Sequence, residues 1–304
     1  MIGETKLTRW AAAPSPTEAE QSERAIRAVR KAINNSPALK NRTIKTFVQG
    51  SYRNRVNVSR ESDVDVGVLC SDTFHFKDRN NLGREMLGLS SPATYGYSSF
   101  KNELEQALRA HFPANTVTRG NKAFSVNSNT VRVQADVVPF FEYRDYFGNA
   151  NYRGGVILIP DKGPNIHNYP ERLLDWWPQI PLHYENGVSK NAATSRSFKG
   201  VTRILKSIRR EMKSTRLYFS DVPSYLCECL AYQTPNAFFH GFSWSQKLEQ
   251  VLGYLESNLA SSKDVSDWTE VDGVKYLFHV SQPWTQEKAL KFVSSCRAFY
   301  TNEQ

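Results

Sequence analysis

Two aspartates separated by one residue are the side chains of this sequence with the clearest chemistry. Asp63 and Asp65 lie in the stretch SDVDVGV, residues 62–68. Side chains two apart on a strand share a face, so both carboxylates point one way and the valines point into a core. Carboxylates forced together repel each other, and a divalent cation relieves the repulsion; Mg²⁺ prefers carboxylates, phosphate oxygens and water. The pattern predicts a metal site, whereas the plain alternative for a lone D-x-D is a solvated edge or turn.

The segment that leads to these aspartates contains a strand and a turn. Residues 44–48, IKTFV, are apolar and rich in β-formers, which predicts a buried strand. The strand breaks at Gly50-Ser51, where glycine allows unusual backbone angles and leaves room for close approach. We expect a second strand over 63–70, so the two strands and the turn position the acids.

A third carboxylate, Asp136, stands within the apolar run QADVVPFF. The segments 122–126 and 130–140, joined by Asn-Ser-Asn, predict a hairpin. A carboxylate in the middle of an apolar strand is costly unless it is paired or bound. Asp136 is therefore the expected third metal ligand, and the alternative is a salt bridge to Arg132 or another base.

The charge of the chain is uneven. Its 304 residues carry a net charge of +9, which suits a polyanionic ligand. Residues 190–216 hold nine Lys and Arg side chains against one acid, Glu211. The hydrophobic share of 40% and the aromatic share of 12% indicate a packed protein with two domains or two lobes, not a disordered one.

Cysteine usage and hydropathy bear on location. The four cysteines lack a disulfide or metal-binding framework, and Cys227-x-Cys229 lies in an apolar helix-like run, so buried thiols are favoured. There is no signal peptide and no stretch long enough to span a membrane. We expect a soluble cytoplasmic protein.

The clearest helix of the chain is expected over 194–212. One face carries an apolar stripe of Phe198, Val201, Leu205, Ile208 and Met212. A second stripe, turned by about 100°, carries Lys199, Arg203, Lys206 and Arg210. We also expect an extended arm over 1–16, helices over 17–34, 100–112, 245–259 and 286–300, a helix starting at Pro223, a strand over 155–160 and a long loop over 71–97.

Together these elements predict an α+β protein with an N-terminal mixed sheet that carries the acids and a C-terminal helical lobe that carries the bases. We expect a catalytic lobe over 1–190, including the N-terminal helix, and a helical lobe over 191–304. A cleft between the lobes would be the natural place for a nucleotide.

The sequence resembles the bacterial cGAS/DncV-like nucleotidyltransferases (CD-NTases), signalling enzymes of CBASS anti-phage systems. The resemblance rests on VQGSYRNRVNVSRESDVDVGV, QADVVPFF, RSFKGVTRILKSIRR and PSYLCECL. It implies a polymerase-β-like nucleotidyltransferase fold with an oligoadenylate-synthase-like helical lobe. It further implies an enzyme that joins ATP, GTP, UTP or CTP into a cyclic di- or trinucleotide without a template, releases pyrophosphate and supplies a second messenger to a downstream effector.

The resemblance also implies roles for individual residues. Asp63, Asp65 and Asp136 would be the catalytic triad that binds two Mg²⁺ ions, with Mn²⁺ as an alternative. The implied nucleotide contacts are Gly50, Ser51 and Lys206 to the triphosphate, Ser224 also to the triphosphate, Tyr225 by stacking on a base, and Lys199 and Arg203 as further phosphate ligands. The alternatives are that Tyr225 is a core aromatic and that Lys206 belongs to a solvated face.

Two other functions share these features. A terminal nucleotidyltransferase that extends RNA 3′ ends or a small acceptor would use every one of the catalytic residues. A non-catalytic protein could bind nucleotide or RNA through the basic helix, although buried acids without a metal would then be a liability. A long RNA is not required by the sequence, because no RRM, KH or zinc signature is present. Base choice, ring size and linkage depend on pocket shape, which the sequence leaves open.

Overall fold

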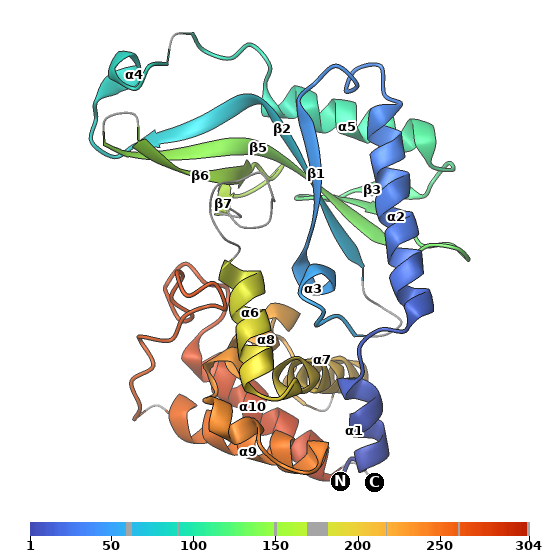
Figure 1. The fold of residues 1–304 in the computed structure, drawn as a ribbon, viewed down its shortest axis with the longest axis vertical. Coiled ribbons are helices and arrows are strands. Elements are labelled where there is room, and N and C mark those ends of the chain that lie inside the picture. The colour runs from blue at the N-terminus through green and yellow to red at the C-terminus, as the bar shows by residue number, and fades with distance from the viewer. Residues whose placement is uncertain are drawn as a thin grey trace. The chain divides into compact units, whose positions relative to one another are not determined.

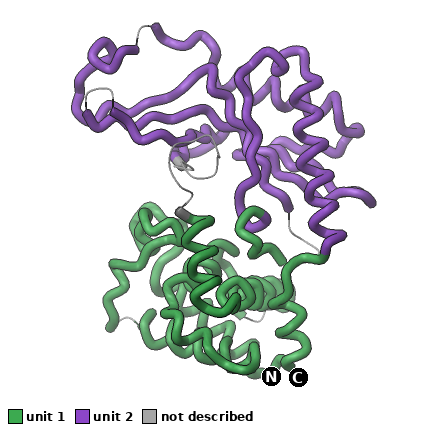
Figure 2. The backbone as a smooth tube through the Cα atoms, in the orientation of Figure 1, with its two compact units in different colours: residues 1–15, 53–61, 182–304 green, residues 16–52, 62–181 purple. Residues whose placement is uncertain are grey.

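The computed structural model describes residues 1–58, 63–89, 91–148, 151–168, 182–216, 218–260 and 262–302 (Figure 1). The chain forms two compact units (Figure 2). The helical unit comprises residues 1–15, 53–61 and 182–304, and the sheet unit comprises residues 16–52 and 62–181. This division differs from the expected one at 190/191, because residues 1–15, 53–61 and 182–190 group with the helical unit.

The sheet unit is built on a mixed sheet, as predicted. The described strands are β1 (Ile44–Gln49), β2 (Val64–Asp78), β3 (Val117–Arg119), β4 (Phe124–Val126), β5 (Ala135–Gly148), β6 (Asn151–Leu158) and β7 (Ile166–Asn168). They run in the order β1-β2-β5-β4-β3, and β6 pairs with β5 and with β7. The β2–β5 pair is parallel, whereas the other pairs are antiparallel.

Two helices, α2 (Pro16–Asn34) and α5 (Tyr97–His111), pack against each other and against β2 and β5 (Figure 1). They cover the sheet face onto which Val64, Val66 and Val68 point, and these three valines are fully buried. The predicted apolar face of β2 is thus confirmed. The opposite sheet face carries a smaller cluster that includes Phe47 and Phe140. The short helices of this part of the chain are α3 (Gly50–Arg53) and α4 (Gly83–Met86).

The helical unit is centred on α7 (Ser197–Thr215), which contacts α1, α6, α8, α9 and α10. The bounds of these neighbours are α1 (Glu4–Ala11), α6 (Leu182–Ala193), α8 (Ser224–Gln233), α9 (Trp244–Leu259) and α10 (Gln286–Asn302), with a 3-10 turn at Asn236–Phe239. The predicted apolar stripe of α7 is confirmed, because all five of its residues are buried in the core of this unit. All four cysteines are free and buried, as expected.

Two predictions of local structure were wrong. Residues 4–11 form the amphipathic helix α1 instead of an extended arm, since Leu7 and Trp10 are buried and Glu4 accepts hydrogen bonds from the first amides of α9. The expected loop over 71–97 is replaced by the second half of β2, which pairs with β5 beyond an irregularity between Cys70 and Phe74, and by α4.

Between the predicted strand at 155–160 and the predicted helix at 194–212, the structure adds β7 and α6, for which no prediction was made. Residues 169–181 of that stretch lie outside the described part of the chain. In addition, the helix expected at Thr17 begins one residue earlier at Pro16, and the second hairpin strand begins at Ala135, not at residue 130. No described helix combines the length and the apolar character that crossing a bilayer demands.

Candidate active site

The predicted acids lie in one row across the sheet because of strand register. Asp65 of β2 is the register partner of Gln49 in β1 on one side and of Asp136 in β5 on the other. Ser125 of β4 is in turn paired with Asp136. Residues in register on adjacent strands point to the same face. Asp63, two residues before Asp65, shares that face, which lies opposite the face that α2 and α5 cover.

Gly50 brings the backbone directly onto this row. It directly follows β1 and has a φ of +69°, in the left-handed region that favours glycine. A Cβ atom at this position would lie 2.1 Å from Oδ2 of Asp65. Only glycine therefore allows the turn to pass so close to the carboxylate. Ser51 follows within the short helix α3.

The carboxylates at the two ends of the group accept hydrogen bonds from neutral side chains. Oδ2 of Asp63 accepts from Nε2 of Gln134 at 3.2 Å, and Oδ1 of Asp136 accepts from Oγ of Ser125 at 2.7 Å. The alternative partner for Asp136, Arg132, instead donates to the carbonyl of Asn127 and lies over the ring of Phe112.

The donor chemistry of this row fits a hard divalent cation. Three half-exposed carboxylates and a serine hydroxyl are oxygen ligands of the kind that Mg²⁺ prefers. As the described side chains lie, no three His, Cys, Asp or Glu residues are arranged to hold one metal ion. The backbone nevertheless places Asp65 and Asp136 side by side on one face of the sheet. The metal triad stays a prediction.

Arg203, an expected phosphate ligand, is committed to the backbone of the helical unit. Its Nε donates to the carbonyl of Ala11 at 2.8 Å, and its Nη1 donates to the carbonyl of Arg55 at 2.6 Å. Nη2 also bonds Ala11, and only 8% of the residue is exposed. Burial lowers the pKa of Arg203 to about 10. These contacts favour a role in holding two chain segments over direct contact with phosphate.

The segment that Arg203 holds lies between the Gly-Ser turn and the aspartates. Arg55 has a φ of +54°, and Asn54, Val56 and Asn57 are buried. Side-chain burial and the Arg203 contact thus fix this loop on the helical unit, although its chain neighbours Gly50 and Asp65 belong to the sheet unit.

Lys206, the expected lysine for the triphosphate tail, is buried and faces an acid. Its Nζ lies 3.8 Å from Oε2 of Glu228 on α8, and both side chains are at most 5% exposed. His183 of α6 approaches the other oxygen of Glu228 with its Nε2 at 3.0 Å, and Asn54 lies 2.7 Å from the same nitrogen. The alternative that Lys206 belongs to a solvated helix face is therefore wrong.

Charge compensation keeps Glu228 ionised. Burial alone would raise the pKa of Glu228, but the hydrogen bond with His183 and the charges of Lys206 and Lys199 together lower it below its ordinary value. A buried carboxylate next to two lysines lowers the net positive charge of this part of α7 and holds Lys206 in a fixed place.

Lys199 lies on the same side of the helical unit. Its Nζ is 5.6 Å from the ring centre of Tyr184, and the guanidinium of Arg53 is 4.7 Å from that ring. Nε of Arg53 is buried without a hydrogen-bond partner. Burial lowers the pKa of Lys199, and the charge of Glu228 partly offsets this.

Tyr225 and Ser224 stand at the start of α8. The hydroxyl of Tyr225 donates to Glu270 at 3.1 Å, and its half-buried ring lies 5.5 Å from that of His183, tilted by 30°. Ser224 is exposed in the first turn, where the backbone amides of the helix favour an anion. Tyr225 has the packing partners of a core aromatic, and its stacking on a base stays a prediction, as does the role of Ser224.

The sequence prediction missed several polar residues around these groups. Glu228 carried the signal used for Asp136, an acid inside an apolar run (LCECLA). Ser125 stands between two buried apolar residues of a short strand. The alternation of apolar and polar residues could therefore have predicted that its side chain points to the opposite face. His183 and Asn54 gave no signal, because their partners are distant in sequence.

The chain is similar to known proteins over most of its length. Residues 185–301 match the model of the cGAS/DncV-like nucleotidyltransferase C-terminal helical domain. A cyclic dipyrimidine nucleotide synthase CdnE of Legionella pneumophila is 38% identical, with 95% of each chain covered. Its counterpart in Cecembia lonarensis is 37% identical, with 93% of each chain covered.

Solved structures agree with this similarity. The CdnE c-UMP-AMP synthase of Rhodothermus marinus, solved with Apcpp and Upnpp, has a TM-score of 0.80 at 27% identity over 100% of this chain and 99% of that one. The CdnE cyclic dinucleotide synthase of Elizabethkingia meningoseptica, solved with GTP and Apcpp, has a TM-score of 0.78 at 29% identity over all of both chains. Both match the sheet unit as well as the helical unit.

Proposed function

Because this chain belongs to the cGAS/DncV-like nucleotidyltransferase family, we propose that it joins two nucleoside triphosphates into a cyclic dinucleotide. The observation that carries the proposal is the row of Asp65 and Asp136 in register on β2 and β5, with Gly50 against Asp65. The predicted polymerase-β-like fold and nucleotidyltransferase class agree with the solved relatives.

The reaction consists of two phosphoryl transfers of the same kind. In each, a ribose hydroxyl oxygen attacks an α-phosphorus, the bond from that phosphorus to the bridging oxygen of the β-phosphate breaks, and pyrophosphate leaves. The first transfer gives a linear dinucleotide, and the second closes the ring, so two pyrophosphates leave per product. Asp136 is the carboxylate that we assign to receive the hydroxyl proton.

The chain's own residues position and hold the reactants. The close approach at Gly50 lets backbone amides of the turn reach the donor triphosphate next to Asp65. Ser125 and Gln134 hold Asp136 and Asp63, which keeps the acids in place before substrate binds. Two Mg²⁺ ions, held by Asp63, Asp65 and Asp136, would neutralise phosphate charge and activate the hydroxyl.

We propose pyrimidine nucleotides as the preferred substrates. The two relatives of 37% and 38% identity are both named cyclic dipyrimidine nucleotide synthases, whereas a cyclic dipurine synthase and a cyclic UMP-AMP synthase are 30% identical. Of these four relatives, the two that share the higher identity with this chain therefore support UTP and CTP as substrates.

We place the enzyme in the cytoplasm, as a source of a second messenger for a downstream effector in anti-phage defence. The family resemblance supports this role, and four buried free cysteines suit a reducing compartment. Neither a membrane nor a nucleic acid is needed for the reaction.

The test is product analysis with the purified full chain, Mg²⁺ and the four triphosphates, each labelled in turn at the α-phosphate. The expected product is resistant to phosphatase, is labelled by UTP or CTP and has the mass of a cyclic dinucleotide. Labelling by purines alone would overturn the base assignment but not the cyclisation. A phosphatase-sensitive ladder that requires an RNA primer would instead identify a terminal nucleotidyltransferase.

A further inference from the structure

His183 of α6 forms a pair with a buried carboxylate that no step of the reaction described above uses. Its Nε2 lies 3.0 Å from Oε1 of Glu228, and the two side chains are 27% and 3% exposed. The pKa of Glu228 is lowered by His183 and by neighbouring lysines, so this carboxylate is ionised at neutral pH. A partly exposed imidazole held by a buried, ionised carboxylate is an arrangement typical of a general acid or base.

The contact with Glu228 determines which nitrogen of the His183 ring is open. An unprotonated Nε2 would direct its lone pair at the carboxylate oxygen, so Nε2 carries a proton and donates it to Glu228. The amide of Asn54 lies 2.7 Å from the same nitrogen and offers its oxygen to the ring once the amide is flipped. Among the described residues, none forms a hydrogen bond with Nδ1. Nδ1 is therefore the atom through which this ring can exchange a proton with a bound molecule.

The charges around His183 favour a protonated ring and an anionic ligand. Glu228 attracts the protonated ring from α8, where Tyr225 also lies with its ring centre 5.5 Å away. Lys206 on α7 lies 3.8 Å from the other oxygen of Glu228, and the charge of Lys199 acts on the same carboxylate. A protonated His183 and the two lysines together outnumber this one acid, so the cluster attracts an anion such as a phosphate.

Lys206 links this cluster to the proposed reaction. It is the residue that we expect to bind the triphosphate tail, and it shares the carboxylate of Glu228 with His183. Asn54, at the Nε2 side of the ring, directly follows α3, the short helix that begins at the Gly-Ser turn. A triphosphate tail bound by Lys206 would therefore have a phosphate oxygen close to His183.

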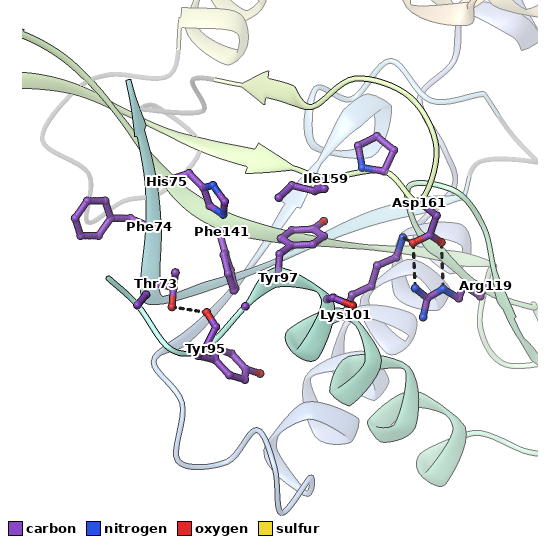
Figure 3. A pocket seen from close by; sticks show the side chains of 14 residues that line it. Thr73, Phe74, His75, Tyr95, Tyr97, Lys101, Arg119, Phe141, Ile159 and Asp161 are labelled. Carbon is purple, nitrogen blue, oxygen red and sulfur yellow. Dashed lines mark hydrogen bonds and ion pairs between the residues drawn. The ribbon is translucent and has the colours of Figure 1, made fainter. Parts of the chain in front are cut away.

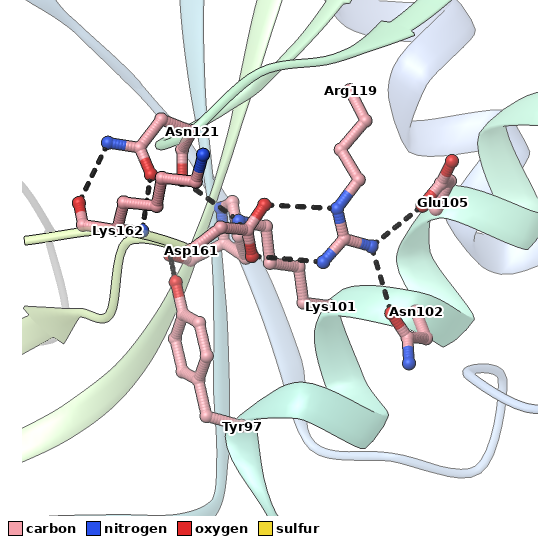
Figure 4. Close-up of polar contacts among 9 residues, drawn as sticks. Tyr97, Lys101, Asn102, Glu105, Arg119, Asn121, Asp161 and Lys162 are labelled. Atoms are coloured by element: carbon pink, nitrogen blue, oxygen red, sulfur yellow. Dashed lines mark hydrogen bonds and ion pairs between the residues drawn. The ribbon is translucent and has the colours of Figure 1, made fainter.

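A polar network in the sheet unit shows a cluster of charges that is closed. Lys101 pairs there with Asp161 at 2.9 Å, and Arg119 binds both oxygens of that carboxylate and one oxygen of Glu105 (Figure 4). The network borders a cavity of about 590 Å³ (Figure 3). Each of these four charges faces an opposite charge, so the network is suited to holding the fold. His183 differs because its second nitrogen is open.

We propose that His183 is the general acid that protonates the leaving pyrophosphate and that Glu228 is its positioning residue. This inference rests on the proposed function. As the ribose oxygen bonds to the α-phosphorus, the bond to the bridging oxygen breaks and its electron pair stays on that oxygen. The proton on Nδ1 of His183 moves to the departing pyrophosphate. The ring is left neutral with its other proton on Nε2, and water returns a proton to Nδ1 before the second transfer.

The test varies the acidity of the leaving group. The probes are the β,γ-difluoromethylene and β,γ-methylene analogues of UTP, or of whichever triphosphate labels the product. The fluorinated leaving group is the more acidic and needs a general acid less. Single-turnover rates with the full chain and Mg²⁺ report the chemical step apart from product release. For the unmodified enzyme we expect the two rates to differ by less than about tenfold, because the proton from His183 offsets the difference in acidity.

His183→Gln keeps a donor for Glu228 but removes the acid. Its rate should fall about a thousandfold with the methylene analogue and less than about tenfold with the difluoromethylene analogue. Because the ratio of the two rates is taken within one variant, a partly unfolded sample does not alter it. His75→Gln is the matched control, since His75 is a half-buried histidine that lines the cavity of the sheet unit, and both of its rates should be unchanged (Figure 3). An equal fall with both analogues in His183→Gln would overturn the proposal.

A second variant tests the positioning role of Glu228. Glu228→Gln keeps an acceptor for Nε2 but loses the charge that attracts the protonated ring, so the single-turnover rate should fall about tenfold. This further fall should be absent in the His183→Gln background, and an equal fall in both backgrounds would show that Glu228 acts apart from His183. Absence of product from the unmodified enzyme would overturn the proposed function together with this inference. Product formation with an unchanged ratio of rates in His183→Gln would overturn this inference alone.

Discussion

The sheet unit and the helical unit use their charged side chains in different ways. In the sheet unit, Asp136 is half-exposed and accepts a hydrogen bond from the neutral hydroxyl of Ser125, which a ligand can replace at small cost. In the helical unit, Arg203 and Lys206 are buried and committed to backbone carbonyls or to Glu228. The strand motif presents its charges for chemistry, whereas the basic helix uses part of its charge to hold the fold. Charge type alone therefore does not identify a ligand site; the partners of each charge decide.

The largest effect is expected when an aspartate of the carboxylate row loses its charge. Asp136→Asn keeps the shape and the partner Ser125 but removes the negative charge, so product formation should fall by about a thousandfold or more, the scale of losing a transition-state contact. The fold should persist, because among the described residues Asp136 forms a hydrogen bond with Ser125 and no ion pair. Turnover of labelled triphosphates and circular dichroism check the two statements.

The matched control for this variant is Glu142→Gln on the same strand and the same face. Glu142 pairs with Arg144 at 2.7 Å, six positions beyond the row. It should retain nearly full turnover. If both variants keep activity, the row is not the catalytic site; if both lose it, the loss reflects damage to β5.

The second effect concerns the close approach of the Gly-Ser turn. Gly50→Ala places a Cβ 2.1 Å from Oδ2 of Asp65 and strains a φ of +69°, so we expect product formation to fall about a hundredfold through displacement of the carboxylate. Gly83→Ala is the control, since Gly83 has a φ of +81° with nothing within 4 Å. The control should lose about 1 kcal/mol of unfolding free energy and no activity. Equal activity in both variants would remove the turn from the site.

The third effect separates a structural arginine from a phosphate ligand. Arg203→Lys retains the charge but cannot span the carbonyls of Ala11 and Arg55, so the free energy of unfolding should fall by about 3 kcal/mol. Denaturant unfolding measures this, and Lys213→Met, in the exposed last turn of α7, serves as the control. A variant with wild-type stability and a raised KM for triphosphate would restore Arg203 as a phosphate ligand.

The fourth effect is smaller and concerns Lys206. Lys206→Met removes a fixed positive charge, and KM for triphosphate should rise about tenfold with less change in kcat if the lysine binds phosphate in the ground state. Glu228→Gln and the double variant complete a cycle that measures the coupling of the pair, whose atoms lie 3.8 Å apart. Unchanged KM and kcat in Lys206→Met would mean that the lysine serves only its partner Glu228.

The fold of this chain was predictable where the hydrophobic residues repeat with the period of a single strand or helix. The valines around Asp65 and the apolar stripe of α7 each repeat with the period of their element, and both are buried as expected. The predictions failed where tertiary contacts decide. Residues 4–11 become a helix because Leu7 and Trp10 find a core formed by distant segments, which no local pattern reveals.

The candidate site was predictable to a similar extent. A strand motif places Asp63 and Asp65 on one face whatever their partner, and the register then brings in Asp136. On a helix, each basic residue has neighbours from other elements, and the sequence cannot tell that Arg203 meets the carbonyl of Ala11 while Lys206 meets Glu228.

The smallest effect shows that the sheet unit, too, contains a carboxylate committed to structure. Arg119 beside Asp161, together with Lys101, holds the pKa of Asp161 at about 2, against about 3.9 in an unfolded chain. Because the folded pKa is lower, Asp161 stabilises the protein above about pH 4, and this contribution is lost as the pH falls towards about 2. Asp161→Asn should therefore lower the free energy of unfolding by about 1 kcal/mol at neutral pH, a modest value since 40% of this side chain is exposed to screening by solvent. Denaturant unfolding between about pH 7 and pH 3 should show the deficit shrinking with acidity, while Asp267→Asn at an exposed site shows none. A deficit that stays constant over this range would mean that Asp161 acts through packing and not through its charge.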